Sequence, residues 1–95
     1  MLHKTVGDSR SSTEANNFTG TIPTSIGNLT NLEVLKIANN SLNGKIPRTL
    51  GNLQQLTVMD LSHNNLEGDI PSNLGDLGLL QHLYLSDNKL KGIIP

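Results

Sequence analysis

Residues 56–71, with the sequence LTVMDLSHNNLEGDIP, contain the pattern that decides the fold of this chain. Leucine or methionine occupies positions 56, 59, 61 and 66, and a Gly-x-Ile-Pro segment follows. The whole pattern recurs every 24 residues, and each copy is marked by one glycine: Gly20, Gly44, Gly68 and Gly92. A fixed period of this length is typical of a solenoid, in which one short unit stacks on its copies.

Apolar residues two positions apart predict a short β-strand in each repeat. These pairs are Leu35 and Ile37, Met59 and Leu61, and Leu83 and Leu85. Side chains alternate along a strand, so the pairs face inward and the residues between them face outward. Equivalent strands one coil apart run in the same direction, which predicts a parallel sheet. Glycine and proline after each strand exclude a long α-helix, so we expect an extended return limb with 3₁₀ turns near residues 24–26, 48–50 and 72–74.

One asparagine per repeat follows the same period, at Asn16, Asn40, Asn64 and Asn88. It lies between positions that face inward, where an unbonded polar group would be costly. An amide side chain both donates and accepts hydrogen bonds, so it can bond the backbone of its own coil and of the adjacent coil. We therefore expect a structural asparagine ladder that holds the turn after each strand.

The composition excludes several classes of function. The chain has 95 residues, a formal net charge of −1, 2% aromatic residues and no cysteine. It therefore lacks the basic surface that nucleic-acid binding requires, and it has no disulfides or thiolate metal sites. No segment approaches the roughly 20 apolar residues of a membrane span, so we expect no direct membrane segment in this chain. The first residues also lack the apolar stretch of a secretory signal.

Catalytic chemistry has no support in the sequence. It contains no paired-carboxylate motif, nucleophile elbow or phosphate-binding glycine loop, and the periodic glycines are expected to serve turns. His63 and His82 fall in different columns of the sheet without a convincing third metal ligand. We expect no catalytic residue, no metal site and no cofactor.

The repeat pattern L-x-x-L-x-L-x-x-N-x-L, present as Leu56, Met59, Leu61, Asn64 and Leu66, resembles the leucine-rich repeat. The Gly-x-Ile-Pro extension and the Leu-Gly-x-Leu run at 50–53 and 74–77 resemble its plant extracellular subclass. This resemblance implies an α/β solenoid: a segment of a leucine-rich-repeat horseshoe with a short parallel β-sheet on the concave face and an irregular or 3₁₀ return limb.

The resemblance covers roughly residues 16–95, or about three full units with partial ends. Residues 1–15 are expected to form a non-repeat N-terminal tail, because the strand positions before Asn16 hold Asp8, Ser11 and Thr13. Family members usually carry cysteine-bearing caps, which this chain lacks. We therefore expect an internal slice of a longer horseshoe, without the kinase domain or membrane span of a receptor kinase.

The subclass includes the ectodomains of receptor-like kinases and receptor-like proteins. The resemblance thus implies a non-catalytic module that binds a protein or peptide, a fragment of a plant receptor ectodomain involved in signal perception. The parent would lie at the plasma membrane or outside the cell. The alternatives are a stand-alone decoy or co-receptor-like binder, an enzyme inhibitor of the polygalacturonase-inhibitor kind, and a truncated product without function.

By the same resemblance, partner contacts lie on the concave sheet. The outward positions form four columns across the strands: Lys36, Asp60 and Tyr84; Val34, Val58 and His82; Ala38, Ser62 and Ser86; and Asn39, His63 and Asp87. We expect Lys36 to lie beside Asp60 as an exposed ion pair, and Tyr84 to anchor a partner, because Tyr is enriched among interface hot spots. The alternative is a solvated, salt-bridged sheet face that binds nothing.

Three sequons for N-glycosylation begin at Asn17, Asn28 and Asn39. Asn28 is expected on the return limb and is the most accessible, whereas a glycan on Asn39 would block the concave face. We also expect the solenoid ends to expose leucines that interior coils bury, which favours marginal stability and self-association through the uncapped ends.

Overall fold

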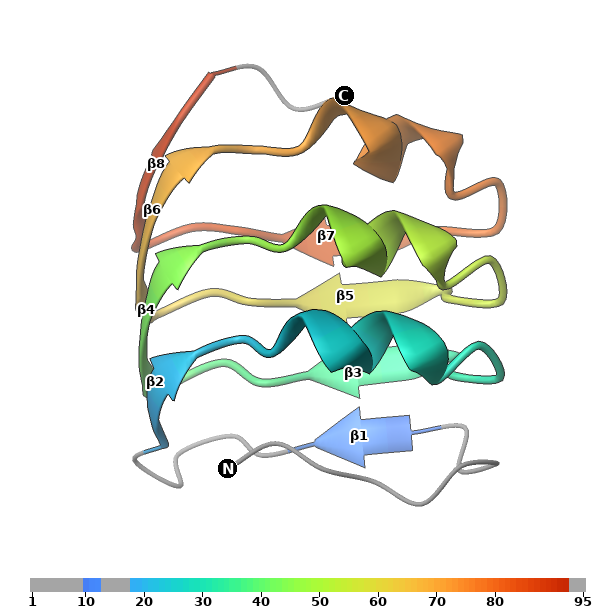
Figure 1. The fold of residues 1–95 in the computed structure, drawn as a ribbon, viewed down its shortest axis with the longest axis horizontal. Helices are drawn as coiled ribbons and strands as arrows, with labels where there is room; N and C mark the ends of the chain where they lie inside the picture. The colour runs from blue at the N-terminus through green and yellow to red at the C-terminus, as the bar shows by residue number, and fades with distance from the viewer. Residues whose placement is uncertain (1–9, 13–17, 93–95) are drawn as a thin grey trace.

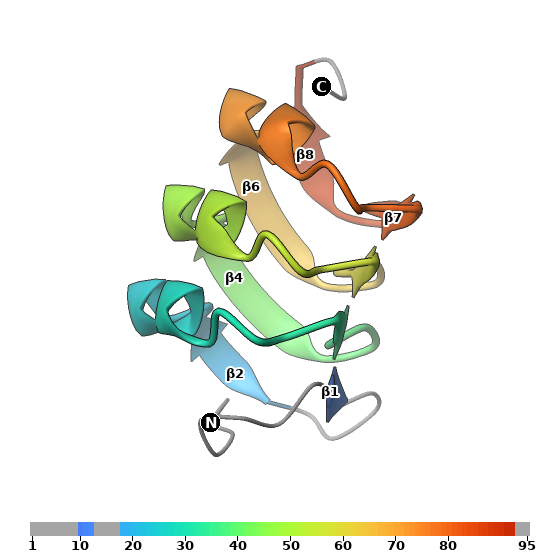
Figure 2. The same ribbon diagram turned by 90° about the vertical axis from the view of Figure 1, so that its right-hand side faces the viewer.

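The computed structural model of this chain describes residues 10–12 and 18–92, and these residues form a solenoid of stacked coils (Figure 1). Each coil contributes a strand, a bend, a second strand and a 3₁₀ helix. The two rows of strands and the row of 3₁₀ helices enclose the core. The helices lie opposite the row of strands that contains β1 and β7 (Figure 2). The predicted solenoid and its 3₁₀ return limb are confirmed.

The first sheet, called sheet A here, contains the strands that the alternating leucines predicted. Its order is β1-β3-β5-β7, and all neighbouring pairs are parallel. Partners are 24 residues apart, as in Leu35 with Met59 and Met59 with Leu83, so the sequence period is also the register. The strands are β1 (Arg10–Ser12), β3 (Val34–Lys36), β5 (Val58–Asp60) and β7 (His82–Tyr84).

A second parallel sheet, called sheet B here, was not predicted. Its strands are β2 (Thr19–Thr21), β4 (Ser41–Lys45), β6 (Asn65–Asp69) and β8 (Lys89–Lys91), in that order. Extended chain was expected in these segments, but pairing was not, because β4 and β6 each bury only one leucine and contain a glycine, which usually weakens a strand. The partners are offset by 22 residues, as in Gly44 with Leu66, so each coil is shifted by two residues relative to the repeat.

The 3₁₀ helices η1 (Thr24–Asn28), η2 (Arg48–Asn52) and η3 (Ser72–Asp76) begin directly after the periodic prolines. Proline fixes φ near the value that the first turn needs, and its carbonyl remains a free acceptor. The carbonyls of Pro23, Pro47 and Pro71 accept the N–H of the residue three positions later at 3.1–3.2 Å. The expected turns are therefore five-residue helices, each of which buries its central apolar residue: Ile26, Leu50 and Leu74.

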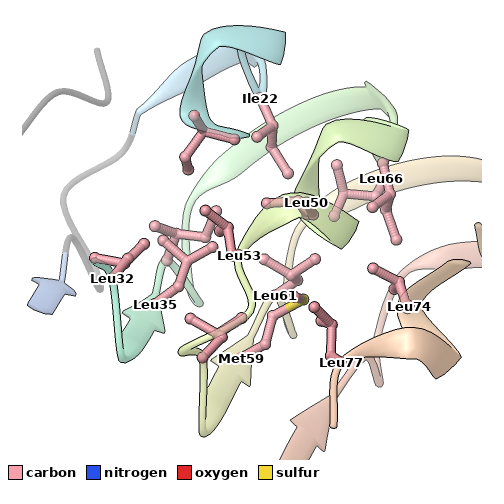
Figure 3. Close-up of a cluster of buried hydrophobic side chains, with 14 of the residues drawn as sticks. Ile22, Leu32, Leu35, Leu50, Leu53, Met59, Leu61, Leu66, Leu74 and Leu77 are labelled. Atoms are coloured by element: carbon pink, nitrogen blue, oxygen red, sulfur yellow. The ribbon is translucent and has the colours of Figure 1, made fainter. Parts of the chain in front are cut away.

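The core is a stack of leucines that fills the space between the two sheets and the 3₁₀ helices (Figure 3). In the two middle coils, the side chains of Leu35, Leu53, Met59 and Leu61 have no solvent exposure. In the last described coil, Leu80, Leu83, Leu85 and Leu90 are only partly buried, although their counterparts Leu56, Met59, Leu61 and Leu66 have no exposure. The following coil therefore completes the burial of these leucine positions.

The asparagine ladder joins each coil to the one before it. The Asn64 Oδ1 accepts the Leu42 N–H at 3.1 Å, and its Nδ2 donates to the carbonyls of Ile37, Leu61 and Ser62. Asn88 repeats these bonds one coil later, with the Leu66 N–H and the Leu61, Leu85 and Ser86 carbonyls. Asn40 likewise accepts from Phe18 and donates to its own coil. Asn16 lies outside the described residues.

Two sets of periodic glycines serve different needs. Gly20, Gly44, Gly68 and Gly92 have φ between 76° and 93°, which side chains rarely tolerate. Gly27 has no such backbone strain, but it packs against η2: a Cβ atom there would lie 2.6 Å from the Thr49 carbonyl oxygen. The first set turns the chain within a coil, and Gly27 allows two 3₁₀ helices to stack closely.

Part of the predicted N-terminal tail takes a strand position. Arg10–Ser12 form β1, which pairs with β3 at the same 24-residue offset as the later strands. The backbone therefore continues sheet A into a segment whose residues lack the apolar repeat pattern. The predicted boundary between residues 15 and 16 lies outside the described residues and stays a prediction.

Substitution of Asn64 by Ala should lower the free energy of unfolding by about 1–3 kcal/mol, because it leaves buried backbone groups unpaired. Asn65→Ala is the matched control, since Asn65 is exposed next to it on β6. Urea denaturation of both variants measures the difference. Equal stability of the two variants would show that the ladder contributes nothing.

Gly27→Ala should destabilise the chain by about 1–3 kcal/mol, because the added methyl forces η1 and η2 apart. Gly78→Ala serves as the control: its Cβ would meet nothing within 4 Å, and removal of a glycine reduces the entropy of the unfolded chain. Thermal melts should place the Gly78 variant at or above the parent protein and the Gly27 variant below it. The reverse order would refute the close approach of the two helices.

Candidate functional site

The outer face of sheet A carries the column that was predicted as the centre of the site. The register pairs Lys36 with Asp60 and Asp60 with Tyr84, so the three residues lie in one row across β3, β5 and β7. Lys36 is exposed, Asp60 is half-buried and Tyr84 is 48% exposed. Strand β7 therefore presents the Tyr84 ring to solvent next to Asp60 on β5, and Lys36 lies one strand further on β3.

His82 and Tyr84 form an aromatic pair on β7. Their ring centroids are 6.1 Å apart and their planes differ by 1°, which is a stacked arrangement. The two residues are two positions apart on one strand, so the alternation of side chains brings them to the same face. Both side chains are exposed, and together they make a flat aromatic surface at the edge of sheet A.

The expected ion pair between Lys36 and Asp60 is wrong. The Asp60 Oδ1 instead accepts hydrogen bonds from the Ser62 N–H at 3.1 Å and the Ser62 Oγ at 2.6 Å. A short polar side chain that bonds its own backbone two residues on is a local arrangement with little entropy cost. An exposed lysine gains less by holding one position, since such pairs contribute little in water. Lys36 is thus left to solvent or to a partner.

Two of the four columns that were predicted to face outward are partly buried, those of Val34 and of Ala38. Val34 is 9% exposed, and in the bend that follows the strands Ala38 and Ser62 are 2% and 7% exposed. The counterparts in the last coil, His82 and Ser86, are exposed, and Val58 is half-buried. Val34, Ala38 and Ser62 therefore present little surface to a partner.

The backbone conformation explains the residue types in the column of Asn39, His63 and Asp87. All three residues have a left-handed backbone, with φ of 58°, 56° and 58°, and all three are exposed. Asn, Asp and His are enriched among the non-glycine residues that adopt this conformation. The His63 Nδ1 lies 3.0 Å from the Asp87 Oδ2, a contact that is an ion pair when the imidazole is protonated. The turn explains the residue types without a ligand.

A second polar ladder on the 3₁₀ side escaped the sequence analysis. The Thr49 Oγ1 donates to the Thr24 carbonyl at 2.7 Å, and the Asn73 Nδ2 donates to the Arg48 carbonyl at 2.8 Å. Both bonds join a side chain to the carbonyl 25 residues earlier. The signal was present in the sequence, because positions 25, 49 and 73 all hold small polar residues, but no single residue type marks it.

Sheet B carries another row that was missed. Lys45, Glu67 and Lys89 are register partners, so basic and acidic residues alternate across its exposed strands. None of these side chains lies within ion-pair distance of another in the part of the chain that is described. The row is a solvated charged face beside the candidate site.

Within the described ranges, no three histidine or acidic side chains gather in a way that could hold a metal ion. No helix in residues 10–12 and 18–92 is long and apolar enough to cross a membrane.

Asp87→Asn should change the free energy of unfolding by less than about 1 kcal/mol, because the pair with His63 is exposed and screened by solvent. Asparagine keeps the preference for the left-handed backbone, so only the charge is removed. Asp76→Asn, at another exposed position, controls for the change in net charge. A loss several times larger in urea denaturation of the Asp87 variant alone would show that the ion pair stabilises the turn.

Comparisons with known proteins agree with this geometry. The leucine-rich repeat pattern matches residues 14–66 and 47–90, which is most of the chain. Comparison with curated proteins gives no significant match. Among solved structures, the fold is similar to that of the PEPR1–AtPEP1 complex, with a TM-score of 0.92 and 41% identity over 95% of this chain and 13% of that one.

Two Arabidopsis receptor structures are equally informative. The ectodomain of GASSHO1/SCHENGEN3 from Arabidopsis thaliana, in complex with CASPARIAN STRIP INTEGRITY FACTOR 2, gives a TM-score of 0.88 and 42% identity over 92% of this chain and 10% of that chain. The structure of the Arabidopsis receptor kinase HAESA, in complex with the peptide hormone IDA and the co-receptor SERK1, gives a TM-score of 0.90. Its sequence identity is 39% over 95% of this chain and 15% of that chain. This chain thus spans between a tenth and a sixth of their length. It belongs to the leucine-rich repeat family, with the fold of a plant receptor ectodomain segment.

Proposed function

We propose that this chain is a ligand-binding segment of a plant leucine-rich-repeat receptor ectodomain, and that sheet A is the surface that contacts a peptide or protein. The observation that carries the proposal is the exposed His82–Tyr84 stack on β7, in register with Asp60 and Lys36. A leucine-rich scaffold does not need an exposed aromatic pair. Large aromatic side chains at the surface are the residues that most often anchor a partner.

The chemistry of the face defines the partner. Neighbouring strands of a sheet are about 4.8 Å apart, so β3, β5 and β7 together span the length of only a few extended residues. Such a peptide would meet the positive charge of Lys36 at one end and the aromatic surface at the other. A peptide that fits this row would carry an acidic residue and, about three residues further on, an apolar or aromatic one. Val34 does not contribute, because it is buried.

The relatives support the class of ligand. GASSHO1/SCHENGEN3 and HAESA were solved with CASPARIAN STRIP INTEGRITY FACTOR 2 and the peptide hormone IDA, and HAESA also with the co-receptor SERK1. The resemblance to these membrane receptor ectodomains also supports an extracellular position of the parent protein. The leucine-rich repeat fold is generally non-catalytic, and we propose that this chain acts by binding alone.

The glycosylation sequons differ in how far they lie from the proposed binding surface on sheet A. Asn28 is exposed at the end of η1, among the 3₁₀ helices that lie opposite sheet A. Asn39 is exposed in the bend at the end of β3, beside the His63 and Asp87 column. A glycan on Asn28 would leave sheet A open, whereas one on Asn39 would border it. Glycosylation at either residue stays a prediction, and Asn17 lies outside the described residues.

Tyr84→Ala should weaken peptide binding about tenfold or more, since truncation of an interface hot spot costs about 2 kcal/mol or above. The probes are peptides selected from a phage-displayed random library on the folded chain, and calorimetry or fluorescence anisotropy measures each Kd. Asn43→Ala is the control, because Asn43 is exposed on sheet B.

Selected peptides that tolerate Tyr84→Ala and Lys36→Ala, but lose affinity with Asn43→Ala, would place the binding surface on sheet B. Failure to select any peptide on the folded chain, with a known receptor ectodomain selected in parallel, would also contradict the proposal. Circular dichroism of each variant excludes unfolding as the cause of lost binding.

A further inference from the structure

Two local hydrogen bonds hold a carboxylate in the middle coil. The Asp60 Oδ1 accepts the Ser62 N–H at 3.1 Å and the Ser62 Oγ–H at 2.6 Å. Ser62 is 7% exposed and Asp60 is half-buried, so water has little access to these bonds. A buried hydroxyl needs an acceptor, and a carboxylate is the strongest acceptor that a side chain offers. We refer to this pair of bonds as the Asp60–Ser62 latch.

The coil itself does not require the latch. The register partners of Asp60 in sheet A are Lys36 and Tyr84, and neither has a carboxylate. The position of Ser62 is held by Ala38 one coil earlier, and alanine has no hydroxyl. The bends after β3, β5 and β7 nevertheless share a left-handed residue with φ between 56° and 58°. The backbone thus forms the same bend without the latch, which leaves the latch free to serve the surface.

The latch competes with an ion pair across the strands. Lys36 is the register partner of Asp60, and neighbouring strands are about 4.8 Å apart, so a lysine side chain is long enough to reach this carboxylate. Lys36 is exposed instead, and no ion pair between the two is recorded within residues 10–12 and 18–92. Two hydrogen bonds to a fixed, partly buried carboxylate outweigh one exposed pair that would immobilise a long side chain. The latch therefore decides what Lys36 can bind.

We propose that Ser62 is a positioning residue for the binding surface on sheet A. By holding the Asp60 carboxylate, it keeps the Lys36 ammonium available to an anionic group of a peptide. This role rests on the proposed binding function and adds the residue that sets its preference for charge. Without the Ser62 hydroxyl, the Asp60 side chain can turn toward Lys36 and compete with the carboxylate of the ligand. The preference for an acidic peptide then falls, whereas the apolar part of the contact is unchanged.

Nuclear magnetic resonance of the ligand-free chain tests the latch. Ser62→Ala removes the shorter of the two bonds, so Asp60 should pair with Lys36, and a further Asp60→Asn change should shift the Lys36 Cε resonance. In the parent background, Asp60→Asn should shift that resonance no more than Glu33→Gln does, which removes an exposed charge directly before β3. A Lys36 resonance that responds equally to Asp60→Asn in both backgrounds would overturn the proposal.

The binding of two tetrapeptides with blocked ends tests the consequence. Glu-Ala-Ala-Phe carries an acidic and an aromatic residue at the spacing of the row, and Gln-Ala-Ala-Phe lacks only the charge. In chemical-shift titrations, Ser62→Ala should weaken binding of the acidic peptide about threefold, as expected for competition by an exposed ion pair, and leave the neutral peptide unchanged. Ser41→Ala, at an exposed position of sheet B, is the control.

Two further variants separate positioning from structural damage. Asp60→Asn combined with Ser62→Ala removes the competing carboxylate and should restore the affinity for the acidic peptide. Asp60→Glu carries the carboxylate past the intact Ser62 and should weaken the acidic peptide as Ser62→Ala does. A double variant as weak as Ser62→Ala would mean that the loss is structural and that the proposal is wrong. If neither peptide binds the parent chain, the result counts against the proposed function, and the Lys36 resonance decides the latch by itself.

Discussion

The coil-to-coil hydrogen bonds of the asparagine ladder are the constraint on which the rest of this structure depends. A solenoid has few contacts between residues far apart in the sequence other than those between adjacent coils, so each joint must be specified locally. One amide per coil fixes three or four backbone groups at the bend between sheet A and sheet B, as Asn64 does with Leu42, Ile37, Leu61 and Ser62. These bonds satisfy buried groups that no other strand or helix reaches. The leucines can then stack at fixed distances.

This arrangement separates scaffold from surface. The buried leucines, the ladder, the positive-φ glycines and the prolines before each 3₁₀ helix are all set by the coil itself. The Asn39, His63 and Asp87 column also belongs partly to the scaffold, because the left-handed turn selects these residue types. What remains for recognition is small: Lys36 on β3 and the His82–Tyr84 stack on β7 are exposed and have no evident role in the coil. The proposed binding function rests on these residues.

Periodic features were predictable from the sequence because each follows from a local rule that is repeated. The alternation around Met59 and Leu61 gave sheet A, the prolines gave the 3₁₀ turns, and the spacing of Asn40, Asn64 and Asn88 indicated bonds to two coils. Sheet B was missed because a strand such as Ser41–Lys45, with one buried leucine and a glycine, has no clear alternation. At the candidate site, the register of Lys36 with Asp60 was predictable. The choice of Ser62 as the partner of Asp60 was not, since it depends on competition between local and cross-strand contacts. The burial of Ala38 depends on a neighbouring coil and has no signal in its own repeat.

The most direct test of the account is residue-resolved hydrogen exchange of the Leu42 and Leu66 amides, which bond the Oδ1 atoms of Asn64 and Asn88. Both lie in sheet B strands, and the ladder predicts that they exchange only when the whole array unfolds, as slowly as the Leu61 amide within the sheet A register. The Asp87 amide has no recorded partner in the described structure and supplies the fast reference in the same sample. If the Leu42 and Leu66 amides exchange as fast as that of Asp87, then the ladder does not hold the coils together, and the central claim is wrong.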